Sequence, residues 1–179
     1  MWEERNYLEE IVHMTHESAC LAVQDLPFRR YVVDACKANA CGRYGKTWKC
    51  PPAVGDFESL QKDCLVYAKA LVFSTVHVLE DSFDIEGMEA GRQAHEQRTD
   101  KVAQLFVGKN IKVLSAGGCG LCKRCTYPDA PCRFPSRARS SVESHGISVV
   151  ELAKQCGLHY KNQPDTVTYF SIILYNDID

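Results

Sequence analysis

Residues 111–125 read Ile-Lys-Val-Leu-Ser-Ala-Gly-Gly-Cys-Gly-Leu-Cys-Lys-Arg-Cys, an apolar segment that passes directly into a loop rich in glycine and cysteine. The β-branched and apolar residues at 111–114 predict a strand, because such side chains fit a half-buried pleated surface. The glycines that follow predict a loop, since glycine adopts turn conformations that other residues avoid. We therefore expect a sheet that carries a cysteine-rich loop at the end of one strand.

Strand and helix patterns alternate on both sides of this segment. Apolar, β-branched runs predict strands at 70–79 and 167–175. Asp56 is a candidate N-cap for a short helix, and apolar spacing predicts a longer helix over 88–106. The acidic, glycine-containing residues 81–87 before that helix predict a surface loop.

The two ends of the chain add further elements. Ser148, followed three residues later by Glu151, forms a capping box that predicts a helix ending at Gly157. Residues 21–23 and 31–33 resemble short strands. Near the start, apolar residues recur at helical spacing over 7–12, which predicts another helix.

The order of these elements predicts the fold class. Strands and helices in this succession are typical of an α/β or α+β fold, in which helices cover a small mixed sheet. The 179 residues fit one domain, because domains commonly hold about 100–200 residues. We therefore predict a single domain over residues 1–179, with cysteine-rich segments at 36–52 and 117–135.

Composition excludes several classes of protein. Hydrophobic residues make up 45% of the chain and charged residues 25%, which argues against a disordered tail, a collagen-like fibre or a coiled coil. No apolar stretch approaches the roughly 20 residues that a bilayer crossing needs, and the start lacks the pattern of a secretory signal, so we expect a cytoplasmic protein without membrane contact. The net charge of -2 gives no reason to expect nucleic acid as a partner. The oligomeric state is left open.

The strongest functional motif is Cys119-Gly-Leu-Cys122-Lys-Arg-Cys125, followed by Cys132 and Pro135. In a chain without a secretory signal, clustered thiols more often bind metals or act in redox chemistry than form disulfides. Bacterial-type 4Fe–4S loops use a Cys-x2-Cys-x2-Cys spacing, followed by a fourth cysteine and a proline. We therefore predict that these cysteines hold a 4Fe–4S cluster. The alternative is a structural zinc site, although zinc sites usually pair two separated Cys-x2-Cys hooks.

A second group of cysteines, Cys36-x4-Cys41-x8-Cys50, ends in Pro51-Pro52. Three thiols are one ligand short of a complete set, so either a distant residue completes a second site or one group lends a ligand to the other. In two-cluster ferredoxins the fourth cysteine of each run serves the other cluster, and by that logic Cys132 could join this group. The seven cysteines thus predict one 4Fe–4S cluster and allow a second, or one cluster with additional structural thiols.

The other three cysteines have no metal-binding spacing. Cys64 and Cys156 lie on the apolar faces of predicted helices, where a free cysteine behaves as a small hydrophobe. We therefore expect structural roles for both and assign no role to Cys20.

Basic residues gather in the two cysteine-rich regions. Residues 36–50 and 119–139 hold nine of the 21 basic residues but one of the 23 acidic residues. Positive charge beside an anionic cluster would offset its charge and raise its reduction potential. The surplus favours docking of an acidic redox partner protein or an anionic small molecule. Solvated surface charges without a partner are the alternative.

At family level, four segments together resemble the "predicted metal-binding protein" family, domain of unknown function 2284. They are Cys41-Gly-Arg-Tyr-Gly-Lys-Thr-Trp-Lys-Cys50-Pro-Pro, Ala116-Gly-Gly-Cys-Gly-Leu-Cys-Lys-Arg-Cys125, Pro131-Cys-Arg-Phe-Pro135 and Ser141-Val-Glu-Ser-His-Gly-Ile-Ser-Val149. The resemblance covers nearly the whole chain. It implies a small cytoplasmic protein that binds metal through its cysteines, and it implies no particular reaction.

The segment after the last motif cysteine is a candidate anion site. Arg133, Arg137, Arg139 and His145 lie there, and Ser140 with Glu143 gives a second capping-box pattern. Helix N-termini bind anions, so this segment could hold a phosphate or carboxylate beside the metal, with His145 as an acid/base group. The structural alternative is a capped turn between the cysteine loop and the next helix.

Three functions compete on these residues. The first is an iron–sulfur protein that passes single electrons. The second is a metal-dependent enzyme in which an iron held by only three thiolates binds substrate at its open position, with Arg137, Arg139 or His145 nearby. The third is a zinc-stabilised interaction module without redox chemistry.

Overall fold

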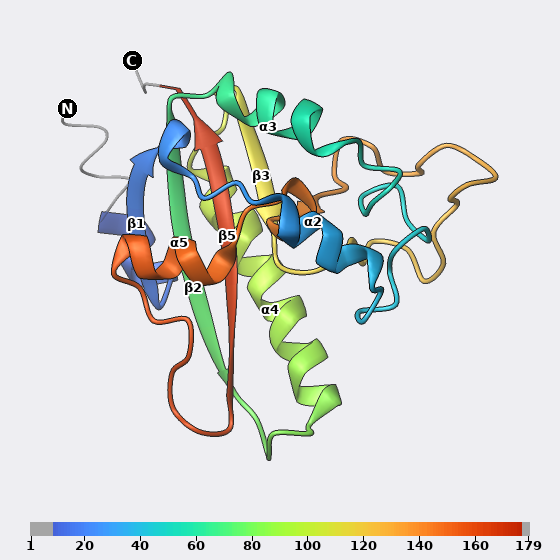
Figure 1. Cartoon of the computed structure of the whole chain (residues 1–179). Helices are drawn as coiled ribbons and strands as arrows, with labels where there is room; N and C mark the ends of the chain where they lie inside the picture. The colour runs from blue at the N-terminus through green and yellow to red at the C-terminus, as the bar shows by residue number, and fades with distance from the viewer. Residues whose placement is uncertain (1–8, 177–179) are drawn as a thin grey trace.

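A mixed sheet organises the computed structural model, which describes residues 9–176. Strand β2 (Lys69–Val78) pairs antiparallel with β1 (Glu17–Ala22) on one side and with β5 (Thr166–Tyr175) on the other. Strand β3 (Ile111–Ser115) pairs antiparallel with β5, and the short β4 (Ser140–Ser141) pairs parallel with β3. The order β1-β2-β5-β3-β4 gives an α+β fold, because antiparallel pairs dominate (Figure 1).

Alternate residues of the central strands face two different layers. Ala70 and Val72 of β2 pack in a buried cluster with side chains of α3 (Phe57–Leu65) and α5 (Val149–Cys156). Leu71 and Phe73 pack on the opposite face, in a cluster that includes Val102 of α4 (Ile85–Gln104). This period-two alternation is the strand signature, and it buries both faces of the sheet between helices (Figure 1).

Most elements lie where the local sequence predicts them. The side chain of Asp56 accepts a hydrogen bond from the Ser59 N–H at 3.0 Å and so caps α3. Ser148 caps α5 by accepting from the Glu151 N–H at 3.4 Å, and Gly157 ends that helix with a φ of +69°. The strands predicted at 70–79, 111–114 and 167–175 are confirmed as β2, β3 and β5.

Helix α4 begins earlier than predicted. The expected surface loop at 81–87 is wrong for its last three residues, which form the first turn of the helix. The cause is a cap: Asp84 accepts a hydrogen bond from the Gly87 N–H at 2.8 Å. A Cβ at Gly87 would overlap with the Asp84 carboxylate, so the glycine that indicated a loop is instead what lets the cap close.

The strand expected at 31–33 is also wrong. These residues belong to α2 (Arg30–Lys37), where the Tyr31 hydroxyl donates to the Glu151 carboxylate at 2.8 Å and Val33 packs close to Gly146. Tertiary contacts therefore outweigh the β-propensity of the local residues. The piece expected at 21–23 is partly right, since β1 ends at Ala22 and a 3-10 helix η1 (Val23–Asp25) follows.

Residues 9–14 are helical, in line with the helix predicted over 7–12, whose first two residues lie outside the described part. None of the helices described has the length and apolar content required to cross a bilayer.

Candidate metal centre

The two cysteine-rich segments meet beyond the edge of the sheet formed by β3 and β4. Figure 1 shows the loop that follows α2 and the loop that follows β3 on the same side of the molecule. Arg43 of the first loop donates a hydrogen bond through Nη1 to the Cys119 carbonyl of the second at 3.1 Å. Trp48 of the first loop donates through Nε1 to the Ala130 carbonyl at 3.0 Å. These two bonds tie the loops together although 76 and 82 residues separate the partners.

Four cysteines line one cavity between these loops. The cavity has a volume of about 290 Å³, and its wall contains Cys119, Cys122, Cys125 and Cys132. All four side chains are partly buried. The structure thus places Cys132 with the three cysteines of its own run.

The cavity wall carries positive charge and no carboxylate. Six basic residues line it, from both loops: Arg43, Lys46, Lys49, Lys123, Arg124 and Arg133. An anionic group in this cavity would therefore be held by favourable Coulomb interactions, which strengthen as water is excluded.

Cys125 has the environment of a thiolate. Burial by itself raises the pKa of its thiol, but hydrogen bonds from the backbone at Tyr127, Trp48 and Thr126, together with the Arg133 charge, lower that pKa below its usual value. The thiolate is the metal-binding form of cysteine. Because one of these backbone groups belongs to Trp48, the first loop helps to prepare a ligand on the second.

A second cavity adjoins the first. Its volume is about 350 Å³, and Cys36, Cys41 and Cys50 lie in its wall together with the half-buried Glu143. Arg43 lines both cavities. Burial raises the pKa values of Cys36 and Cys50, and for Cys36 the neighbouring Cys41 and Glu143 act in the same direction.

Gly118 lies close to the first cysteine-rich loop. A Cβ at this position would lie 3.3 Å from Cys50 Sγ and 3.1 Å from Arg43 Cδ. Such contacts are tighter than normal packing, so a larger residue would push the two loops apart. Gly118 therefore allows close approach between the two loops, whereas a Cβ at Gly120 would instead meet Arg92 of α4.

The cysteines surround these cavities and do not converge on one point. Within residues 9–176, no three His, Cys, Asp or Glu side chains are placed to hold a single metal ion.

Two of the remaining cysteines lie in the hydrophobic core. Cys64 is completely buried, and burial raises the pKa of its thiol to about 11. Cys156 packs against the same core cluster, and burial raises its pKa as well. Cys20 lies on β1, and its side chain is exposed.

The candidate anion residues occupy different places. Arg133 lines the first cavity and donates to the Arg124 carbonyl at 2.8 Å. Arg137 and Arg139 line a third cavity, of about 230 Å³, which also contains Cys119 in its wall. The three arginines that the sequence groups together are therefore divided between the first and the third cavity.

His145 lies in the interior and not at a cavity. Its ring is 1% exposed, and Nδ1 lies 3.2 Å from both the Ser141 carbonyl and Ser144 Oγ. Burial lowers its pKa to about 4. The capping box expected between Ser140 and Glu143 is wrong, because Ser140 pairs in β4 and Ser141 accepts from the Ser144 N–H at 3.0 Å.

Three cavity residues were missed by sequence reasoning. Arg43 and Glu143 belong to motifs of the sequence, but nothing local shows that they face the cysteines. Glu96 lies in the middle of α4 and lines the third cavity, and no motif marks it. Their positions depend on how the helices and loops pack.

A comparison with protein families identifies the family of this chain. Residues 19–175 match the family described as "Predicted metal-binding protein (DUF2284)". The chain belongs to this family. The match includes all seven motif cysteines and both loops that build the cavities. No curated protein and no solved structure matched the chain in the searches.

Proposed function

We propose that this metal-binding protein is an iron–sulfur protein that passes single electrons. The observation that carries the proposal is the first cavity, of about 290 Å³, whose wall contains four cysteines. Four thiols spread around such a space suit a 4Fe–4S cluster better than one zinc ion.

The chain's own residues supply three kinds of support for a bound cluster. Cys119, Cys122, Cys125 and Cys132 would hold it, and the backbone groups that hydrogen-bond Cys125 would stabilise the thiolate charge. The six basic side chains of the wall would offset the negative charge of the cluster and raise its potential. When bound, such a cluster supplies one-electron transfer.

Trp48 adds a barrier to water at this site. Its ring packs edge-to-face against Tyr127 with centroids 4.9 Å apart, and it lies in the wall of the first cavity. Aromatic cover excludes solvent, and solvent exposure is one determinant of cluster potential. We infer that Trp48 tunes the potential and does not bind substrate.

Metal and sulfide analysis of anaerobically purified protein tests the proposal. We expect iron and acid-labile sulfide in equal amounts, about four of each per cluster, and a broad visible absorption that bleaches on reduction. Eight of each would indicate that the second cavity also holds a cluster. Protein that contains zinc without sulfide would contradict the proposal and favour the zinc-stabilised module.

The second cavity favours one other function. It combines three cysteines with Glu143. Cys132, which could have been their fourth cysteine ligand, lies in the wall of the first cavity. An iron bound there by three thiolates would keep a position for substrate, as in a metal-dependent enzyme. A spectral change on adding cyanide, a small ligand for open iron, would favour this function, and an unchanged spectrum would argue against it.

The basic wall of the first cavity also suggests the electron donor or acceptor. We propose that an acidic redox protein docks here, because opposite charges steer encounter. With a reduced acidic ferredoxin as the probe, the rate of electron transfer should fall as ionic strength rises. The double charge reversal Lys46→Glu/Lys123→Glu should slow transfer by about tenfold at low ionic strength.

A remote charge reversal provides the control for this measurement. Lys154→Glu lies on α5, on an exposed position outside the cavity wall. It changes net charge in the same sense and should leave most of the rate intact. Equal slowing per charge in both variants would show that net charge, and not the cavity wall, controls the reaction.

A further inference from the structure

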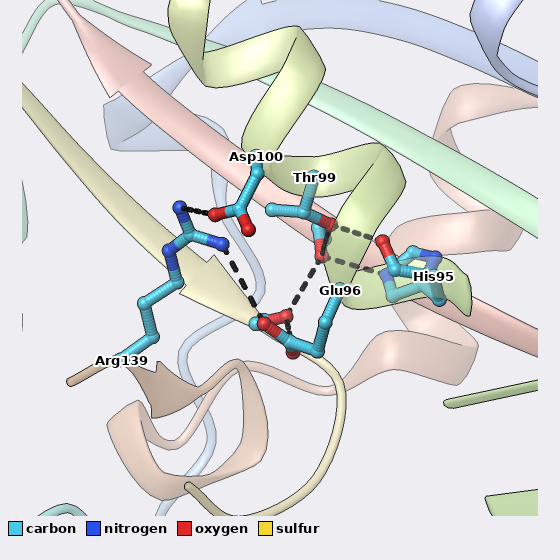
Figure 2. Close-up of polar contacts among 7 residues, drawn as sticks. His95, Glu96, Thr99, Asp100 and Arg139 are labelled. Carbon is cyan, nitrogen blue, oxygen red and sulfur yellow. Dashed lines mark hydrogen bonds and ion pairs between the residues drawn. The ribbon is translucent and has the colours of Figure 1, made fainter. Parts of the chain in front are cut away.

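Polar side chains fill part of the interface between α4 and the sheet. Five of them are at most 8% exposed: Thr75, His95, Thr99, Ser115 and Ser171. A buried hydroxyl or ring nitrogen without a partner costs about 1–3 kcal/mol, so such groups must satisfy one another. Figure 2 shows the hydrogen bonds that join several of them beside the Glu96–Arg139–Asp100 ion pairs.

These side chains form a chain of hydrogen bonds, and the outer half of this hydrogen-bond chain runs along β2. His77 Nε2 lies 2.9 Å from Thr75 Oγ1, and the same oxygen lies 2.8 Å from His95 Nδ1. His77 is half-buried near the end of β2, so it connects the buried groups with solvent. Its ring packs against Gly91 of α4, where a Cβ would lie 2.9 Å from His77 Cγ. A glycine inside a helix costs about 0.5–1 kcal/mol relative to alanine, and here it makes room for this imidazole.

The inner half of the hydrogen-bond chain runs from α4 over β5 and β3 towards the cysteine loop. His95 Nε2 lies 2.7 Å from Ser171 Oγ, which lies 3.3 Å from Ser115 Oγ. Ser115 donates to the Glu96 carboxylate. Glu96 lines the third cavity together with Cys119, so the chain ends beside the candidate metal centre.

One consistent set of donors and acceptors connects both halves. Ser115 donates to Glu96, so Ser115 accepts from Ser171. Ser171 in turn accepts from His95 Nε2–H. His95 Nδ1 must accept from the Thr75 hydroxyl, which accepts from His77. Burial, and next the charge of His77, lower the pKa of His95 to about 3, with backbone hydrogen bonding at Phe170 opposing only in part. The ring is therefore neutral near pH 7 and has one donor and one acceptor nitrogen.

Thr99 belongs to the same cluster but does not connect it to Glu96 or to solvent. Its hydroxyl donates to the His95 carbonyl at 2.9 Å, so it can only accept from Ser171 Oγ, 3.0 Å away, when the Ser171 hydroxyl turns from Ser115 to Thr99. It thus forms a side branch, which provides a natural control.

We propose that the side chains from His77 to Glu96 form a proton relay that serves the cavity beside Cys119. A proton from water enters at His77, and each group passes one proton to the next. His95 receives a proton at Nδ1 as it releases one from Nε2, so no buried charge forms on its ring. Glu96 gains the proton and becomes a neutral acid. His95 is left with its proton on Nδ1, so its ring must turn over and the hydroxyls must rotate before a second proton can pass.

The relay can supply protons when the cavity side is covered by a bound molecule or a docked protein. The coupling of this transfer to electron uptake rests on the proposed function. The relay itself does not, because its protons can be followed without reference to a bound cluster.

Hydrogen exchange at His95 tests the relay. In uniformly nitrogen-15-labelled protein, we expect the buried His95 Nε2 proton to exchange with solvent at least about 100-fold faster than the backbone amide protons of Phe73 and Ile172, which exchange only when the core opens. A side chain with a purely structural role would exchange together with those amides. That result would overturn the relay.

Matched variants locate the path. Thr75→Val cuts the outer half and Ser171→Ala the inner half, and each should slow the His95 proton to the rate of the core amides, because the ring must accept on one nitrogen while it releases on the other. Thr99→Val makes the same change as Thr75→Val on the side branch and should leave exchange fast. Equal slowing in both threonine variants would contradict the path, and the core amides report in every case whether the fold is intact. If anaerobically purified protein holds no iron, or holds zinc, and the His95 proton still exchanges through the relay, the proposed function is contradicted and the relay is supported.

Discussion

Replacing Cys125 by serine is expected to remove most of the bound iron and to destabilise the fold. The serine hydroxyl does not ionise near neutral pH, so the cavity loses a thiolate ligand. Loss of a hydrogen-bond partner behind a ligand already costs about 10–100-fold in metal affinity, and loss of the ligand itself should cost more. Because metal binding and folding are linked, the melting temperature of anaerobic protein should fall with the iron content.

The same substitution elsewhere provides the control. Cys156→Ser changes a partly buried cysteine that packs against the core and lines neither cysteine cavity. Its iron content should stay at the wild-type level. Cys122→Ser should behave as Cys125→Ser does, because both side chains line the first cavity. Iron lost equally from the Cys125 and Cys156 variants would contradict the assignment of ligands.

Gly146→Ala is expected to be the most destabilising small substitution near the second cavity. Gly146 has a φ of +73°, and a Cβ would lie 2.4 Å from Phe57 Cε2 and 3.2 Å from Val33 Cγ2. A left-handed backbone costs an alanine about 1–2 kcal/mol, and overpacking adds about 1–3 kcal/mol. The melting temperature should fall by about 2–4 °C for each kcal/mol lost.

Gly157→Ala separates the two causes. Gly157 has a similar φ of +69°, but no atom lies within 4 Å of the position of a Cβ. Only the backbone cost of about 1–2 kcal/mol should appear there. Similar destabilisation in both variants would show that α2 and α3 can move away from Gly146, and that the wall carrying Glu143 is less rigid than the contacts indicate.

The elements with local signatures could be predicted from the sequence. The central strands follow apolar, β-branched runs that are buried continuously, and Asp56, Ser148 and Gly157 act at the ends of their helices as their side chains predict. The cysteine spacing also predicts a metal site, because ligands within a few residues of each other are close in any fold, and this assignment of ligands stays a prediction. The predicted family is confirmed, whereas the identity of the metal group stays a prediction.

Errors arose where distant contacts outweighed local preference. Residues 31–33 are β-branched and aromatic, but their contacts with Glu151 and Gly146 place them in a helix. Gly87 looked like part of a loop and is the position that lets Asp84 cap α4. In both cases the deciding partner or the available space could not be seen in the neighbouring sequence.

The sequence by itself determined that seven cysteines gather in two segments and that strands and helices alternate around them. The tertiary structure alone decided that Cys132 joins its own run, that Glu143 faces the other three cysteines, and that Arg43 stands between the cavities. It also brought Thr75, His95 and Ser171 into one polar chain. The physical reason is that β5 lies between β2 and β3 in the sheet, so residues more than a hundred positions apart, such as Lys69 and Tyr175, become neighbours through pairing that no local pattern encodes.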